Sequence, residues 1–132
     1  MPRICWQLHG GRPCVEVVLL RVSDGQPQVR RLLGDTGAGS VTSTFELLLT
    51  RADCLMAGGV PVKPARLSMA YRGVFRAYLV PVQIRGLGFN DSLPAVAVPN
   101  PPAGFHGIAC FRFLNRFTYG NFGDPDKFGL EV

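Results

Sequence analysis

The sequence has few charged residues, no long apolar run and no apolar leader. Charged residues make up 17% of the 132 residues and hydrophobic ones 47%, a balance that argues against intrinsic disorder. No apolar stretch approaches the roughly 20 residues that cross a bilayer. The first residues, from Met1 to His9, lack the apolar core of a signal peptide. We therefore expect no membrane partner and a cytoplasmic location.

The sequence also lacks a metal-binding pattern. There is no C-x-x-C, and no cysteine stands at zinc-like spacing from His9 or His106. The four cysteines are Cys5, Cys14, Cys54 and Cys110. We expect free buried thiols, with a disulfide between Cys5 and Cys14 as the alternative. No metal and no other cofactor is expected.

Basic residues outnumber acidic ones, but they form no basic arm. The 14 Lys and Arg against 9 Asp and Glu give a net charge of +5, and Arg30-Arg31 is the one adjacent basic pair. Scattered cations of this kind are typical of solvated strand faces and turns, so we expect no nucleic acid as primary partner. The alternative is a small basic β-barrel that stacks single-stranded bases on aromatics such as Phe75 and Tyr78.

Glycine and proline are abundant, which disfavours long helices. Together, 16 Gly and 11 Pro account for about a fifth of the chain, and short strands joined by turns tolerate them best. The length suits a single domain over residues 1–132 and excludes a bilobal enzyme with two full domains.

Local patterns predict a mostly β chain. A β-branched run over 14–22, the turn Ser23–Pro27 with its Asp-Gly pair, and a returning strand over 28–33 indicate a β-hairpin. A second hairpin is predicted within 65–84, with its tip around Tyr71-Arg72-Gly73. The remaining expected elements are strands over 41–45, 93–98 and 128–132, a turn or two of helix over 46–52, and a helix over 107–117.

A Gly-rich loop, from Gly34 to Ser40, follows the first hairpin and admits three interpretations. A phosphate-binding loop fails because no Lys is near and the glycine order is wrong for a dinucleotide fingerprint. A structural Asp-Thr-Gly turn is common, with the carboxylate bonding nearby backbone N–H groups. The third interpretation is a protease loop in which Asp35 presents its carboxylate to a water, Gly37 lets the backbone turn, and Thr36 locks the loop.

The order of these motifs resembles the retropepsin-like aspartic proteases over about residues 14–132. A hairpin leads into the D-T-G-A that begins at Asp35, a flap hairpin lies near Met69–Gly73, and the stretch from Gly107 to Phe117 matches the late helix block of the family. A closing strand follows. The resemblance implies an all-β closed barrel with one short C-terminal helix, which is half of a pepsin-type enzyme.

Three positions depart from the family pattern. Gly34 stands where an aliphatic residue is usual, Cys110 replaces the glycine under the active-site loop, and Arg112 replaces the Asp or Asn that braces the site. These departures motivate the alternative hypothesis of a retropepsin-fold dimerisation or peptide-binding module that is catalytically weak or inactive.

Aspartic proteolysis needs two carboxylates that share one proton. Asp35 is the one aspartate in a D-[ST]-G context, so the second carboxylate must come from another chain, and a two-fold homodimer places it. The first hypothesis is therefore an aspartic endopeptidase that is active as a homodimer on polypeptide substrates. The resemblance implies catalytic positions and substrate-binding positions, with an ordinary surface hairpin as the alternative to the flap. The catalytic positions are Asp35, Thr36 and Gly37, and the substrate-binding positions are Ala38, Gly39, Tyr71, Arg72 and Gly73.

Overall fold

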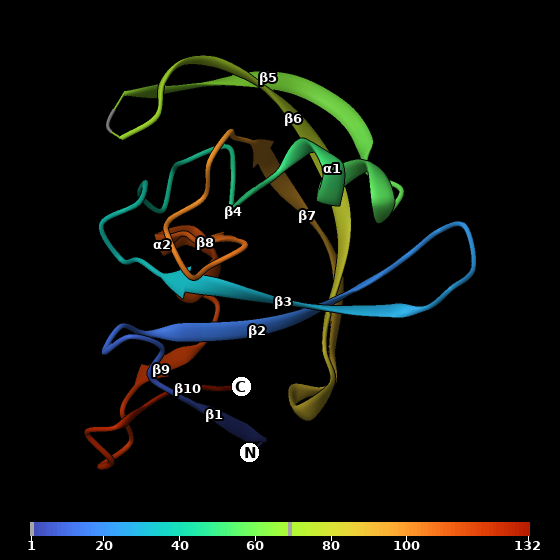
Figure 1. Cartoon of the computed structure of the whole chain (residues 1–132). Coiled ribbons are helices and arrows are strands. Elements are labelled where there is room, and N and C mark those ends of the chain that lie inside the picture. The colour runs from blue at the N-terminus through green and yellow to red at the C-terminus, as the bar shows by residue number, and fades with distance from the viewer. Residues whose placement is uncertain (1, 69) are drawn as a thin grey trace.

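Ten strands and three short helices make up the computed structural model, which describes residues 2–68 and 70–132 (Figure 1). The strands are β1 (Arg3–Gln7), β2 (Cys14–Leu20), β3 (Pro27–Gly34), β4 (Leu47–Leu49), β5 (Val60–Ser68), β6 (Arg72–Ile84), β7 (Phe89–Ala97), β8 (Gly107–Ala109), β9 (Thr118–Gly120) and β10 (Lys127–Glu131). The helices are α1 (Arg51–Met56), the 3₁₀ turn η1 (Arg85–Leu87) and α2 (Phe111–Leu114).

Six of the strands close into a barrel. They follow one another in the order β2-β3-β8-β4-β7-β6, and Val18 of β2 opposite Gln83 of β6 closes the circle. Strand β5 lies outside this circle, pairs with β6, and forms with it the long hairpin that arches over one end of the barrel (Figure 1). The predicted closed barrel with a short helix near the C-terminus is confirmed.

The first hairpin forms for the reasons that its sequence predicted. Val15, Val17 and Leu19 alternate along β2 and are 0% exposed, and each such burial stabilises the fold by about 1.5–3 kcal/mol. At the turn, Gly25 takes a positive φ of 73°, and the Asp24 carboxylate accepts the N–H of Gln26.

Two predicted elements near the centre of the chain are wrong. Residues 41–45 form no strand, because Ser43 Oγ accepts the backbone N–H of Ser40 and competes with strand pairing. The Leu47–Leu49 run, expected to be helical, is the buried strand β4 between β8 and β7. The helix starts later, at Arg51, and the hydroxyl of its N-cap residue Thr50 accepts the N–H of Asp53.

The helix predicted over 107–117 is shorter than expected. Gly107, Ile108 and Ala109 form β8, which pairs with both β3 and β4. A Cβ atom at Gly107 would collide with the carbonyl of Leu48, so the close strand approach depends on glycine. Of the predicted helix, only the residues of α2, from Phe111 to Leu114, are α-helical.

The N- and C-terminal strands form a second, smaller sheet below the barrel, in the order β1-β10-β9 (Figure 1). The N–H of Val132 donates to the carbonyl of Pro2 at 3.1 Å, so the two ends of the chain lie side by side. All four cysteines are free thiols, and the alternative disulfide between Cys5 and Cys14 is not formed. Within the described residues, no helix combines the length and apolarity needed to cross a membrane.

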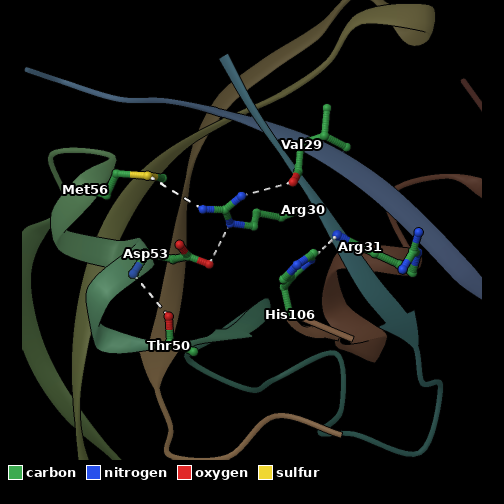
Figure 2. A network of polar contacts seen from close by, with 7 residues as sticks. All are labelled: Val29, Arg30, Arg31, Thr50, Asp53, Met56 and His106. Atoms are coloured by element: carbon green, nitrogen blue, oxygen red, sulfur yellow. Dashed lines mark hydrogen bonds and ion pairs between the residues drawn. The ribbon is translucent and has the colours of Figure 1, made fainter. Parts of the chain in front are cut away.

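A polar network ties β3 to two other segments (Figure 2). The Nε of Arg30 donates to the carboxylate of Asp53 in α1 at 2.9 Å. The backbone N–H of Arg31 donates to Nδ1 of His106, just before β8, also at 2.9 Å. The network thus supports the strand that leads directly into the Asp-Thr-Gly loop, since β3 ends at Gly34.

Candidate active site

The Asp-Thr-Gly loop is attached at both ends to the segment from β8 to α2. The N–H of Asp35 donates to the carbonyl of Ala109 at 3.0 Å, and the N–H of Phe111 donates to the carbonyl of Ala38 at 2.9 Å. Between these two bonds, the carboxylate of Asp35 accepts the N–H of Gly37 at 2.9 Å. Thr36 and Gly37 are exposed and Asp35 is half-buried. The loop therefore presents its carboxylate near the surface on a rigid support.

A cavity of about 490 Å³ lies between this loop and the β5–β6 hairpin. Figure 1 shows the hairpin as a roof over the segment that follows β3. The lining residues are Asp35, Gly37, Ala38, Gly39, Ser43, Phe45, Leu48, Arg66, Leu67, Ser68, Ala70, Tyr71 and Ile108. The cavity thus has Asp35 at its floor and a mostly apolar wall.

The structure brings together five of the eight predicted site residues: Asp35, Gly37, Ala38, Gly39 and Tyr71 line the cavity. Thr36, Arg72 and Gly73 do not line it. Thr36 is exposed at the loop tip.

The hairpin tip falls earlier in the chain than predicted. Arg72 and Gly73 already belong to β6, where they lie opposite Ser68 and Leu67 of β5. Met69, which the flap prediction included, lies outside the described residues.

Tyr71 connects the hairpin tip to the loop after β7. Its hydroxyl donates to the carbonyl of Asn100 at 2.9 Å, and burial raises its pKa above the ordinary value. Asn100 has a positive φ of 49° within the Pro-rich stretch 99–102, which points its carbonyl at the tyrosine. The tip is therefore latched to the barrel over the cavity.

Several cavity residues were not predicted from the sequence. Phe45, Leu48, Leu67 and Ile108 form the apolar wall, and Arg66 contributes the one cation among the described lining residues. None of these five residues belongs to the Asp-Thr-Gly loop or to the predicted hairpin tip, so no local motif marks them as site residues. Only Ile108 carried a signal, since it belongs to the late block that resembles the family.

The three departures from the family pattern are accommodated in different ways. A Cβ at Gly34 would lie 3.4 Å from the ring of Phe128, which fills the space of an aliphatic side chain. Cys110 is 1% exposed, and burial followed by the charges of Asp35 and Glu46 raises its pKa to about 12, so the thiol is neutral. Arg112 donates to the carbonyl of Ser43 at 2.8 Å and holds the loop that continues from Gly39.

A buried ion pair supports the same region. Glu46 is 0% exposed and accepts two hydrogen bonds from the guanidinium of Arg116, one of them 2.7 Å long. The hydrogen bond with Glu46 raises the pKa of Arg116. The carbonyl of Glu46 also accepts the N–H of Cys110, so the pair fixes the start of α2 beneath the Asp-Thr-Gly loop.

A six-stranded closed barrel with an Asp-Thr-Gly loop under a hairpin defines the retropepsin-like fold. The crystal structure of a retropepsin-like aspartic protease from Rickettsia conorii matches this chain with a TM-score of 0.59 at 15% identity, over 97% of this chain and 89% of that one. EIAV protease complexed with the inhibitor HBY-793 matches with a TM-score of 0.47 at 16% identity, over 80% of this chain and 86% of that one. No protein-family model and no curated protein matches the sequence. The chain has the retropepsin-like fold, as the sequence predicted.

Proposed function

We propose that this protein is an aspartic endopeptidase that works as a homodimer. The observation that carries the proposal is the position of Asp35 on the floor of a cavity roofed by a hairpin. A structural Asp-Thr-Gly turn would explain the bond between Asp35 and Gly37, but it does not require a cavity above the carboxylate. The R. conorii structure, described as a retropepsin-like aspartic protease, has the same fold.

The homodimer follows from the number of carboxylates that the reaction needs. Asp35 is the one aspartate of the sequence in a D-[ST]-G context, and its loop has an exposed tip at Thr36 and Gly37. A two-fold axis beside this tip would bring together the two Asp35 side chains and the two Thr36 hydroxyls. In this arrangement Thr36 bonds across the axis and holds the loops in register.

The proposed mechanism uses the two carboxylates as one acid–base unit. Two carboxylates about 3 Å apart cannot both ionise comfortably, so the pair holds a single proton. The ionised Asp35 takes a proton from a water, which attacks the carbon of the scissile amide. The protonated Asp35 of the partner then supplies the proton to the leaving nitrogen, and the peptide bond breaks.

The substrate would be an extended polypeptide segment with an apolar residue near the scissile bond. Phe45, Leu48, Leu67 and Ile108 supply an apolar wall beside Asp35, which favours apolar side chains. Ala38 and Gly39 leave room at the floor, and Tyr71 closes the roof. Backbone hydrogen bonds of the strand type would hold the segment between loop and hairpin.

The test is cleavage of a fluorogenic peptide with an apolar centre at acidic pH, with and without a pepstatin-type inhibitor. Asp35→Asn should abolish inhibitable cleavage, because the amide cannot exchange the proton, while folding and dimerisation remain. Asp126→Asn, which changes an exposed turn aspartate, is the matched control and should cleave normally. Unchanged cleavage by Asp35→Asn would overturn the proposal.

The alternative function gives a different result in the same assay. A catalytically weak or inactive retropepsin-fold module would bind the peptide without inhibitable turnover. Sedimentation measurements complete the test, because a monomer under every condition would leave Asp35 without the second carboxylate and contradict the mechanism.

A further inference from the structure

The net positive charge of this protein is concentrated in one segment. From Cys54 to Asn90 there is no Asp or Glu, whereas five cations stand there: Lys63, Arg66, Arg72, Arg76 and Arg85. The other nine Lys and Arg equal the nine acidic residues in number. The whole excess of +5 therefore lies in the segment that forms β5, β6 and η1.

The hairpin register places three of these cations on one face. Arg66 lies opposite Val74, and Ser68 lies opposite Arg72. Because side chains alternate along a strand, Arg66, Arg72 and Arg76 share the outer face, and all three are exposed. The inner face carries Ala65, Leu67, Phe75 and Ala77, which pack toward the barrel. None of the three arginines forms an ion pair with another described residue.

This cationic face is continuous with the proposed active site. Arg66 also lines the cavity that contains Asp35. Arg76 lines a second cavity of about 460 Å³ together with Arg51 and apolar residues such as Val74 and Val98. The cations thus extend from the cavity that contains Asp35 to the second cavity, which Arg76 lines.

We propose that this face selects acidic polypeptide segments that flank the scissile bond. The proposal rests on the proposed function and names its substrate class. Exposed cations without acidic neighbours attract anionic segments and raise the rate at which they associate. Because β5 is an edge strand, its free backbone groups can pair with an extended polypeptide that enters the cleft below.

The same face is poorly suited to single-stranded nucleic acid, which uses exposed aromatics as stacking platforms. Tyr78 is 3% exposed and Phe75 packs on the inner face. The large exposed apolar side chains of the hairpin are aliphatic: Val60, Val62, Val74 and Leu79. The burial of Tyr78 and the packing of Phe75 disfavour the stacking role that the sequence left open for these two residues.

The binding test uses Asp35→Asn protein, so that no peptide is cleaved during the measurement. Two labelled peptides share an apolar centre, one flanked by three Glu residues and the other by three Gln residues. Fluorescence anisotropy at low salt should show binding of the Glu peptide about tenfold tighter than of the Gln peptide. High salt should bring the ratio close to one, because exposed charges are screened within a few ångströms.

Substitution of the three arginines should remove the preference. The triple variant Arg66→Gln, Arg72→Gln, Arg76→Gln should bind the two peptides equally at low salt. The control is Arg12→Gln, Arg21→Gln, Arg85→Gln, which removes the same charge outside the β5–β6 hairpin and should keep the tenfold ratio. Circular dichroism of both variants checks that they are folded.

The outcomes separate this inference from the proposed function. Equal binding of both peptides by the Asp35→Asn protein, or equal loss of preference in both triple variants, overturns the inference. Tighter binding of a single-stranded oligonucleotide than of the Glu peptide overturns it as well. Inhibitable cleavage of both peptides at equal kcat/KM would leave the proposed function standing and the inference refuted. A preference in binding without any cleavage would refute the proposed function alone.

Discussion

The ion pair between Glu46 and Arg116 gives a quantitative test of how the site is supported. Glu46 is 0% exposed, and its carboxylate accepts two hydrogen bonds from Arg116, which lies two residues after the end of α2. Substitution of Arg116 by Met keeps much of the side-chain length and removes the positive charge. Glu46 then remains in the interior as a carboxylate without its cation.

The expected cost follows from the burial of the two partners. Removal of one partner of a buried ion pair costs about 3–5 kcal/mol, because a charge is left without compensation. The side chain of Arg116 is 37% exposed, so water can reach Glu46 after the substitution and offsets part of this cost. We therefore expect Arg116→Met to lower the free energy of unfolding by about 2–3 kcal/mol.

Urea denaturation, followed by the fluorescence of Trp6 at one protein concentration, measures this change. Arg21→Met is the matched control, because the pair of Arg21 with Asp24 is exposed, with 41% and 44% of the side chains accessible. Such pairs contribute about 1 kcal/mol or less. The double variant Glu46→Gln, Arg116→Met should recover part of the stability, since it removes the unpaired charge. A cost for Arg116→Met no greater than for Arg21→Met would refute this account of the site.

Three further predictions concern single groups. Cys5, which is half-exposed, should be alkylated at pH 8 before Cys110, because burial raises the pKa of Cys110 to about 12. If mass spectrometry finds the first label on Cys110, the prediction is wrong. Burial lowers the pKa of His106, and its neutral ring accepts the backbone N–H of Arg31. The stability that His106 contributes to the fold is therefore complete above pH 6.5 and is lost as the pH falls below that value. His106→Gln should therefore lose less stability than the original protein between pH 7 and pH 5, as measured in urea. Tyr71→Phe removes the latch of the hairpin tip and should speed amide hydrogen exchange there by about fivefold, whereas unchanged exchange would exclude a latch.

The parts of the fold that the sequence predicted are those with local causes. The hairpin of β2 and β3 follows from alternating Val and Leu and from the Asp24-Gly25 turn, which need no distant contact to be recognised. The second hairpin was predicted for similar reasons, although its tip was placed slightly late. The Asp-Thr-Gly loop was found because three residue types at fixed spacing have a specific chemical use.

The wrong predictions concern segments whose structure depends on distant partners. Leu47–Leu49 is a short apolar run, and such a run does not distinguish a buried strand from a helix. It becomes a strand because β7 and β8 flank it with free backbone groups. Ile108 and Phe111 have helical spacing, but pairing of Ile108 with Leu33 and Leu48 outweighs it.

The candidate site divides in the same way. Asp35, Ala38 and Gly39 lie within one loop, so their proximity could be read from the sequence. Arg66 and Leu48 lie in different strands, and only the arch of the hairpin over the loop brings them to the cavity. Their role depends on tertiary packing that no local pattern encodes.

The fold shows that cations which are separated along the sequence lie together on one face of the hairpin. Counted along the chain, the cations of the β5–β6 hairpin are scattered, because no two are adjacent. Strand alternation and the absence of any acid between Cys54 and Asn90 gather three of them on one face. In the proposed homodimer, two such hairpins would roof a single cleft, so the two flanks of one substrate would leave the cleft beside two cationic outer faces, above one pair of Asp35 carboxylates. Acidic flanks on both sides of the scissile bond would then contribute to binding, and a peptide with acidic residues on one side only should lose part of the preference.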